Sequence, residues 1–331
     1  MPPLPCLDIK PYTGGYCQCR LSKSTLPLVL VSQCVIFPMR DFSYAAAGSV
    51  EEAVSLLSAH GERAKILSGG TDILVQLREG QREADLVLDI KKIPELMTST
   101  YDPAKGWTLG ASVPCFQIYD HEQLAKAYPA IADAARIIGG WQIQSRASLG
   151  GNLCNSSPAA DSTPALIALD ATCEIAGPQG RRRVAVAQFC TDPGKNVLAR
   201  GEMLVAFHFA PAEKQAGSAY LRFIPRNEMD IAVVGVGSWL RLSPTGDKIE
   251  AARIALGAVA PTAKVAEEAE KFLVGKTPTE ENFAQAGELA KKVASPISDK
   301  RGPAEYRLHL VGVLVKRTLT TAAARALNPS A

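Results

Sequence analysis

Two glycine-rich segments constrain this chain of 331 residues more than any other feature. SGGTD (68–72) follows the apolar run AKIL and precedes a helical pattern, whereas SLGGN (148–152) lies in a polar stretch. Glycine allows positive φ angles and a close approach of backbone to ligand, and consecutive N–H groups near a helix start attract anions. One Gly-Gly pair is usually only a turn, but two such segments favour a shared polyphosphate ligand.

The common nucleotide fingerprints do not fit these segments. Neither reads GxGxxG, so a Rossmann dinucleotide site is disfavoured. Neither reads GxxxxGK[ST], which excludes a P-loop. The residues alone therefore leave the identity of the ligand open.

Charge and hydropathy exclude two classes of partner. The formal net charge is +3, so no strong basic field indicates nucleic acid, and we interpret the basic run in GPQGRRRV as a solvated hairpin tip. No stretch of about 18 or more apolar residues exists, so we predict no transmembrane span. We expect a cytoplasmic protein.

The eight cysteines do not form the pattern of a disulfide framework. Cys6, Cys17, Cys19 and Cys34 lie near one another, but their spacing matches no ferredoxin-like cluster motif. We interpret the other four as buried thiols. The four histidines stand singly without HExxH, so we predict no metal site in this chain.

The pattern along the chain predicts an extension followed by two domains. Residues 1–38 carry no helical period, so we interpret them as an extension, disordered or due to start-codon choice. A capping-box helix that begins at Ser49, a strand at 64–67, a helix at 71–79 and a strand at 84–90 give an α/β-like order. We expect a helix at 122–138 and a long polar loop at 139–164. After a boundary at 211–217, we expect an antiparallel meander and three helices, at roughly 264–274, 279–294 and 303–326.

The segments AKILSGGTDIL and ASLGGNLCNSSPAADSTPAL, with Asp161 nine positions after Asn152, resemble the flavin-adenine-dinucleotide (FAD) subunit of the molybdenum hydroxylases. That family includes the medium chains of carbon monoxide, nicotinate and bacterial xanthine dehydrogenases. The ending DKRGPAEYRLHLVGVLVKRTL is similar to the last helix of the family. The resemblance covers about residues 39–326.

The resemblance implies an α+β protein with a two-subdomain FAD-binding domain of the vanillyl-alcohol-oxidase (PCMH) type. This domain would cover 39–213 and divide near 95–105. A C-terminal domain of antiparallel sheet with helices would cover 214–327.

The resemblance also implies that the two glycine segments close over the pyrophosphate of FAD. The first wall would consist of Lys65, Ile66, Leu67, Ser68, Gly69, Gly70, Thr71, Asp72 and Ile73. The second wall would consist of Ser148, Gly150, Gly151 and Asn152. For Asp72 a helix cap, and for Asn152 an Asx turn, are alternative roles.

Four further positions match the family's cofactor contacts. Asp161 would accept hydrogen bonds from cofactor hydroxyls, or else cap the following helix. Leu204 would meet the edge of the flavin ring through its backbone. Arg222 would reach the flavin as a cation, or else be a surface charge on a strand. Ile231 would cover the ring face, or else pack in the core.

The implied function is electron transfer without a catalytic side chain in this subunit. A small partner subunit with two [2Fe–2S] clusters would donate electrons, and a large partner subunit would hold molybdopterin, in a dimer of heterotrimers. A self-sufficient FAD oxidoreductase of the same fold is the alternative, and a scaffold without flavin is a third hypothesis. Substrate and final acceptor stay open.

Overall fold

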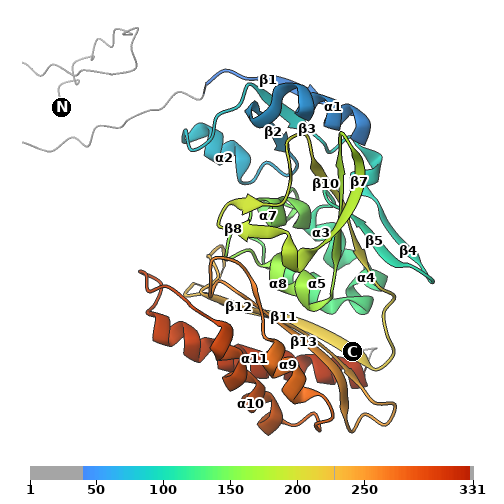
Figure 1. The fold of residues 1–331 in the computed structure, drawn as a ribbon, viewed down its shortest axis with the longest axis vertical. Helices are drawn as coiled ribbons and strands as arrows, with labels where there is room; N and C mark the ends of the chain where they lie inside the picture. The colour runs from blue at the N-terminus through green and yellow to red at the C-terminus, as the bar shows by residue number, and fades with distance from the viewer. Residues whose placement is uncertain (1–39, 227, 329–331) are drawn as a thin grey trace, which may run out of the picture.

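The computed structural model describes residues 40–226 and 228–328. The predicted extension at 1–38, with Cys6, Cys17, Cys19 and Cys34, lies outside the described residues. Figure 1 shows three tiers along the long axis of the molecule, each built on its own sheet.

The first tier is a parallel three-stranded sheet in the order β1-β3-β2. Its elements are β1 (Ser43–Ala46), α1 (Val50–His60), η1 (Gly61–Arg63), β2 (Ala64–Leu67), α2 (Ile73–Arg78) and β3 (Leu86–Asp89). The Ser49 hydroxyl caps α1 by accepting from the backbone N–H of Glu52 at 3.1 Å, while the Glu52 carboxylate accepts from Gly48 N–H at 2.8 Å. The predicted capping box and the β-α-β order are therefore confirmed.

The second tier contains an antiparallel sheet in the order β4-β5-β10-β6-β7. Its strands are β4 (Ser99–Asp102), β5 (Gly106–Gly110), β6 (Thr172–Gly177), β7 (Gly180–Ala185) and β10 (Met203–Phe209), with a small hairpin of β8 (Cys190–Asp192) and β9 (Lys195–Asn196). The 3-10 helices η2 (Pro94–Met97) and η3 (Val186–Gln188) flank it. The chain passes from the first sheet to the second between Asp89 and Ser99.

Helices pack beside this second sheet, and two of our predictions for them are wrong. They are α3 (Cys115–Asp120), α4 (Glu122–Ala127), α5 (Pro129–Ala135), α6 (Trp141–Gln144), α7 (Leu149–Cys154) and α8 (Ser162–Ala168). The helix expected at 122–138 divides at Pro129, because proline has no N–H to continue α4 and instead begins α5. The expected loop at 139–164 contains α6, α7 and the start of α8.

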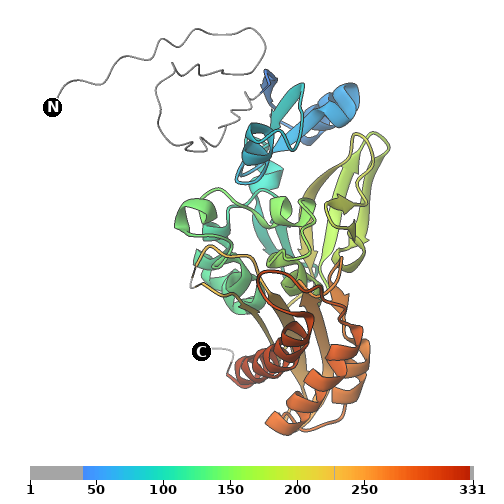
Figure 2. The same ribbon diagram turned by 90° about the vertical axis from the view of Figure 1, so that its left-hand side faces the viewer.

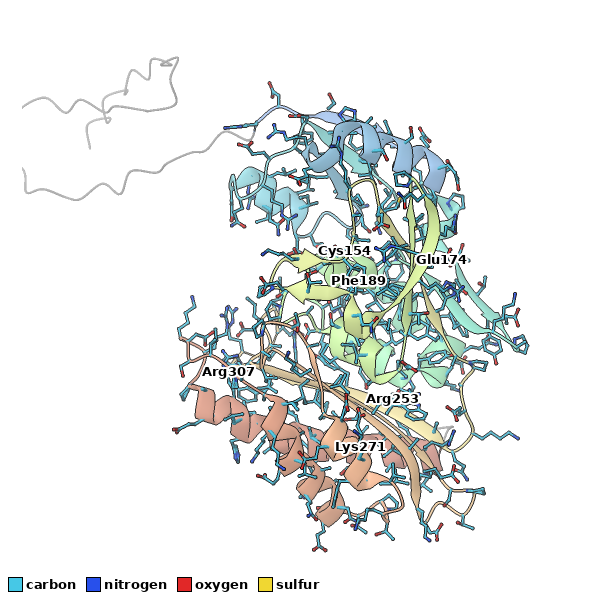
Figure 3. The ribbon with its side chains drawn as sticks, viewed as in Figure 1. Cys154, Glu174, Phe189, Arg253, Lys271 and Arg307 are labelled. Atoms are coloured by element: carbon cyan, nitrogen blue, oxygen red, sulfur yellow. The ribbon has the colours of Figure 1, made fainter. Side chains whose placement is uncertain are left out.

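The third tier is an antiparallel meander, β11 (Ala216–Phe223), β12 (Val234–Leu242), β13 (Ile249–Gly257) and β14 (Lys264–Val265). One face is covered by α9 (Glu267–Leu273), α10 (Glu280–Ala290), η4 (Lys291–Val293) and α11 (Ala304–Leu327). Arg307 of α11, labelled in Figure 3, fixes this helix to the sheet by donating to the Val233 carbonyl at 2.8 Å and to Asp299 at 2.7 Å. The meander and the three helices are confirmed, with shifted ends.

The opposite face of the meander packs against the second tier. Helix α8 lies on β12 and β13, and a Cβ atom on Gly237 of β12 would stand 2.4 Å from the Pro164 carbonyl oxygen. A bidentate ion pair reinforces the contact, since Arg325 of α11 donates to both carboxylate oxygens of Asp133 of α5 at 2.7 and 3.0 Å.

The protein is an α+β protein, as the family resemblance implied. None of the helices in the described ranges is both long and apolar enough to span a membrane.

The close approach at Gly237 makes a test of the tier interface. We expect Gly237→Ala to lower the free energy of unfolding by about 1–3 kcal/mol, because the new methyl group must push α8 away from β12. Gly48→Ala is the control, since the nearest atom to an added Cβ is 3.7 Å away. Urea denaturation measures both variants, and equal stability of the two would contradict the packing described.

Candidate functional site

The first glycine segment forms the turn between β2 and α2. Gly70 has φ of +81°, a conformation that glycine adopts without strain. In the part of the chain that the structure describes, the N–H groups of Gly69, Gly70, Thr71 and Asp72 donate to no other protein group. Four consecutive free donors at the start of a helix form a concave binding site for an anion.

The second glycine segment is the N-terminus of α7 rather than a loop. Ser148 caps this helix, and its hydroxyl accepts from Gly151 N–H at 3.1 Å. Gly150 N–H donates to the Ala111 carbonyl, also at 3.1 Å, and Asn152 N–H donates to the Ser148 carbonyl at 3.0 Å. The backbone donors of this wall are thus engaged within the chain, and the first segment supplies the free ones.

The two segments touch directly, although they lie 80 residues apart in the sequence. The Ser68 hydroxyl is 3.2 Å from that of Ser148 and donates to that of Ser112 at 3.1 Å. A Cβ atom on Gly69 would stand 2.3 Å from the Arg146 carbonyl oxygen, so only glycine permits this backbone contact. The predicted pairing of the two segments is present in the structure.

The side chain of Asn152 joins the second wall to α8. Its Oδ1 atom accepts from the N–H and the hydroxyl of Ser162, at 3.2 and 2.6 Å. An amide group whose oxygen accepts both bonds presents its NH₂ group as a further donor. Asn152 therefore makes a link between two helices rather than the Asx turn considered as its alternative role.

A cavity of about 460 Å³ lies between the two segments, within the range of roughly 300–1,000 Å³ that is usual for ligand pockets. Thirteen of the seventeen predicted residues line it: Lys65, Ile66, Ser68, Gly69, Gly70, Thr71, Asp72, Ile73, Ser148, Gly150, Gly151, Asn152 and Leu204. The lining does not include Leu67, Asp161, Arg222 or Ile231. Leu67 belongs to β2, the strand that leads into the first segment.

The cavity has a third wall that the sequence did not predict. It runs from the β8–β9 hairpin into β10 and adds Asn196, Leu198, Ala199, Arg200, Gly201 and Glu202 to the lining. These residues carry no motif, and only the position of Leu204 pointed to this part of the chain. Gly61, Glu62 and Arg82 of the first tier also line the cavity, and they too belong to no motif that the sequence shows.

Cations line the cavity at the end nearest the first tier. Lys65, Arg82 and Arg200 have no acidic partner within 4.0 Å among the described residues. Burial, together with the charge of Arg82, lowers the pKa of Lys65. Positive charge without a partner beside four free N–H groups is suited to a ligand with negative charges.

Asp72 occupies the N-cap position of α2 but makes no capping hydrogen bond through its side chain. Desolvation at the cavity wall raises the pKa of its carboxyl group, and the charge of Arg82 opposes that effect. The alternative role as a helix cap is therefore not realised in the structure.

Asp161 and Arg222, which do not belong to the lining of the cavity, form a buried ion pair. Arg222 of β11 donates to Asp161 at 2.6 Å, and the Tyr220 hydroxyl donates to the other carboxylate oxygen at 2.8 Å. Asp161 stands at the N-cap position of α8 without capping it. Both alternative roles, a helix cap for Asp161 and a surface charge for Arg222, disagree with this arrangement.

Ile231 lies in the connection between β11 and β12 and is 51% exposed, so the alternative of core packing is wrong. Leu204 is buried at a β-bulge of β10.

Cys115 and Cys173 are buried free thiols, whereas Cys154 and Cys190 are only partly buried. Cys154, labelled in the middle tier in Figure 3, also lines the cavity. Within residues 40–226 and 228–328, no group of three or more metal-ligating side chains comes together.

Comparisons with known proteins agree with this geometry. Two family models match the chain: the FAD binding domain in molybdopterin dehydrogenase, over residues 40–211, and the CO dehydrogenase flavoprotein C-terminal domain, over residues 219–322. The chain is 34% identical to the putative xanthine dehydrogenase FAD-binding subunit of Escherichia coli, over 87% of this chain and 98% of that protein. It is 32% identical to the carbon monoxide dehydrogenase medium chain of Hydrogenophaga pseudoflava, over 86% and 98%.

Solved structures show the same fold. Carbon monoxide dehydrogenase from Hydrogenophaga pseudoflava superposes with a TM-score of 0.83 at 32% identity, over 87% of this chain and 99% of that chain. Quinoline 2-oxidoreductase from Pseudomonas putida superposes with a TM-score of 0.81 at 29% identity, over 88% and 100%.

The buried pair generates a prediction for stability against pH. Burial raises the pKa of Asp161 from 3.8 to about 6, although Arg222 and Tyr220 oppose the rise. The folded state then holds the proton more tightly than the unfolded state. The contribution of this group to the free energy of unfolding therefore falls as pH rises from about 4 to about 6, by up to about 3 kcal/mol.

Chemical denaturation between pH 4 and 7 measures this effect. Asp161→Asn should remove the step, and Tyr220→Phe should move it to higher pH because the carboxylate loses a donor. A step of the same size and midpoint in all three proteins would contradict the assignment.

Proposed function

The chain belongs to the family of FAD-binding subunits of the molybdenum hydroxylases, and from this premise we propose how its own residues hold the cofactor and which partners it serves. It is an oxidoreductase subunit that binds FAD and transfers electrons within a multi-subunit dehydrogenase. The observation that supports our assignment of the site is the row of four free N–H groups at Gly69–Asp72, which faces α7 across the cavity.

The residues present fit the pyrophosphate of FAD. The free N–H groups of the first segment would bind its oxygens, and Gly70 gives the turn the conformation that exposes them. Lys65, Arg82 and Arg200 would neutralise its negative charge. The NH₂ group of Asn152 would donate from the second wall.

FAD, when bound, supplies a redox centre that accepts electrons and passes them to an external acceptor. This chain's residues contribute by orienting it and by excluding water. Leu204 and Ile66 give the cavity apolar walls, while the hydrogen bond from Gln76 to Asn155, at 3.2 Å, joins α2 to the end of α7 and holds the two walls together.

Two of the relatives are named carbon monoxide dehydrogenase medium chains, and this name implies one larger and one smaller partner subunit. We propose that the small subunit carries two [2Fe–2S] clusters and donates the electrons, and that the large subunit holds molybdopterin. We also propose that two such heterotrimers form a dimer and that the complex is located in the cytoplasm.

Filling the cavity from the second wall tests the cofactor site. Gly151 is exposed to the cavity, and an added Cβ would meet only the Ser148 hydroxyl, at 3.3 Å. We expect Gly151→Leu to fold normally but to lose FAD affinity by about tenfold or more, because the side chain occupies cofactor space.

Flavin content and the melting temperature of the apoprotein are the two measurements. Gly48→Leu, outside the cavity, is the control for an added side chain and should keep its flavin. Retention of FAD by Gly151→Leu at the level of the unmodified protein would refute the placement of the cofactor.

A further inference from the structure

The three consecutive arginines at 181–183 lie in β7, directly after the hairpin turn that the sequence predicted. Successive side chains of a strand point to opposite faces of the sheet. Arg181 and Arg183 both reach Glu174, at 2.8 and 3.6 Å, whereas Arg182 reaches Glu202, at 2.7 Å. The hairpin is therefore confirmed, but Arg181 and Arg182 are ion-paired rather than simply solvated.

Arg182 binds both ends of the segment 197–202, most of which forms the third wall of the cavity. It donates to the Val197 carbonyl at 2.9 Å and to the two carboxylate oxygens of Glu202 at 2.8 and 2.7 Å. We call these three hydrogen bonds the Arg182 clamp. The same carboxylate accepts from Ala199 N–H at 2.7 Å, so one guanidinium and one carboxylate together close the segment.

The clamp has a better geometry than most ion pairs at a protein surface. The side chain of Glu202 is only 14% exposed, and bidentate pairing gives an arginine and a carboxylate a fixed relative orientation. The guanidinium of Arg182 keeps the pKa of Glu202 below its usual value, although burial opposes this effect. A Cβ on Gly177 of β6 would stand 2.7 Å from Cγ of Glu202, so glycine leaves the space that this side chain occupies.

The clamped segment meets the first tier as well as the cavity. Residues 198–202 line the cavity without interruption. A Cβ on Gly61 would stand 2.8 Å from Nε of Arg200, and one on Gly201 would stand 2.5 Å from the Ser58 hydroxyl. Figure 2 shows the tip of the β6–β7 hairpin beside α1. The position of Arg200, a cation of the cavity, therefore depends on the conformation of this segment.

Little else fixes that conformation. Residues 197–202 lie between β9 and β10 and belong to no helix or strand, so no ladder of backbone hydrogen bonds holds them. Arg182 itself does not line the cavity. A segment without its clamp would sample more conformations, and a ligand would then have to order it on binding, at a cost in affinity.

We propose that Arg182 is a positioning residue for the cofactor, which from outside the cavity holds the segment 197–202 in the conformation that meets FAD. The inference rests on the proposed placement of FAD in the cavity. With the clamp in place, the third wall is ordered before the cofactor binds, and the cost of ordering it does not reduce the affinity for FAD.

Titration of the full chain with FAD, after removal of its own flavin, tests this role. We expect Arg182→Met to weaken FAD binding on the order of tenfold. Arg183→Met is the matched control, because it removes the same charge from the same strand and leaves the clamp intact. Arg183 is 61% exposed and makes a single contact with Glu174, so this variant should bind FAD normally.

Hydrogen exchange separates positioning from a general loss of stability. In the absence of FAD, the N–H groups of Ala199 and Glu202 should exchange faster in Arg182→Met than in the unmodified chain, and FAD should restore their protection. Arg182→Lys keeps the charge but lacks the planar fork that holds three acceptors, so it should recover only part of the affinity. Should Arg182→Met not fold, Arg182→Lys decides by the same two measurements.

A double-mutant cycle shows whether Arg182 acts through Glu202. In the background of Glu202→Gln, the further change Arg182→Met should cost only about threefold in FAD affinity, because the contact with Val197 is what remains of the clamp. A full tenfold loss in that background would contradict the proposed route.

Weaker FAD binding with faster exchange confined to residues 197–202 supports the proposal. Unchanged FAD affinity in Arg182→Met, an equal loss in Arg183→Met, or a loss without faster exchange in the segment overturns it. Gly151→Leu separates this result from the placement of the cofactor. If Gly151→Leu loses FAD while Arg182→Met keeps it, the placement stands and only the role of Arg182 falls, whereas retention of FAD by both variants overturns the placement as well.

Discussion

The site depends on one contact between two backbones. Gly69 approaches Arg146 so closely that an added Cβ would stand 2.3 Å from its carbonyl oxygen. This contact, with the hydrogen-bonded hydroxyls of Ser68 and Ser148, sets the first tier against the second. The distance between the free N–H groups of the first segment and the N-terminus of α7 follows from it. The width of the cavity is thus fixed by the absence of a side chain rather than by a side-chain interaction.

The sequence predicted the elements whose causes are local. The capping-box spacing of Ser49 and Glu52 predicted the start of α1, and the two glycine segments predicted two of the three walls of the cavity. The division of a helix at Pro129 could have been read from the same rules, since proline lacks a donor. The sequence did not predict that SLGGN begins a helix, because two glycines oppose helix formation. In the structure the cap by Ser148 and the hydrogen bond from Gly150 to Ala111 offset that tendency.

Other features could not be predicted because they arise from tertiary contacts. Arg200 and Arg82 line the cavity through the packing of distant segments, and no local pattern marks them. The family resemblance predicts Asp161 and Arg222 as cofactor contacts, and this stays a prediction. The structure adds that Asp161 binds both Arg222 and Tyr220, and that Asp161 and Arg222 do not belong to the lining of the cavity. In that position they fasten α8 to β11, and so connect the domain that holds the cofactor to the C-terminal domain.

Strand order has a consequence for how the protein is made. β10 is the last strand of the second sheet in the chain but lies at its centre, between β5 and β6. During synthesis, β4 to β7 have no common sheet until β10 inserts, and the third wall of the cavity arrives with it. Such non-local pairing is slow, because a long loop must close first. The cavity is therefore complete only once β10 has joined the sheet and brought the third wall beside the two glycine segments.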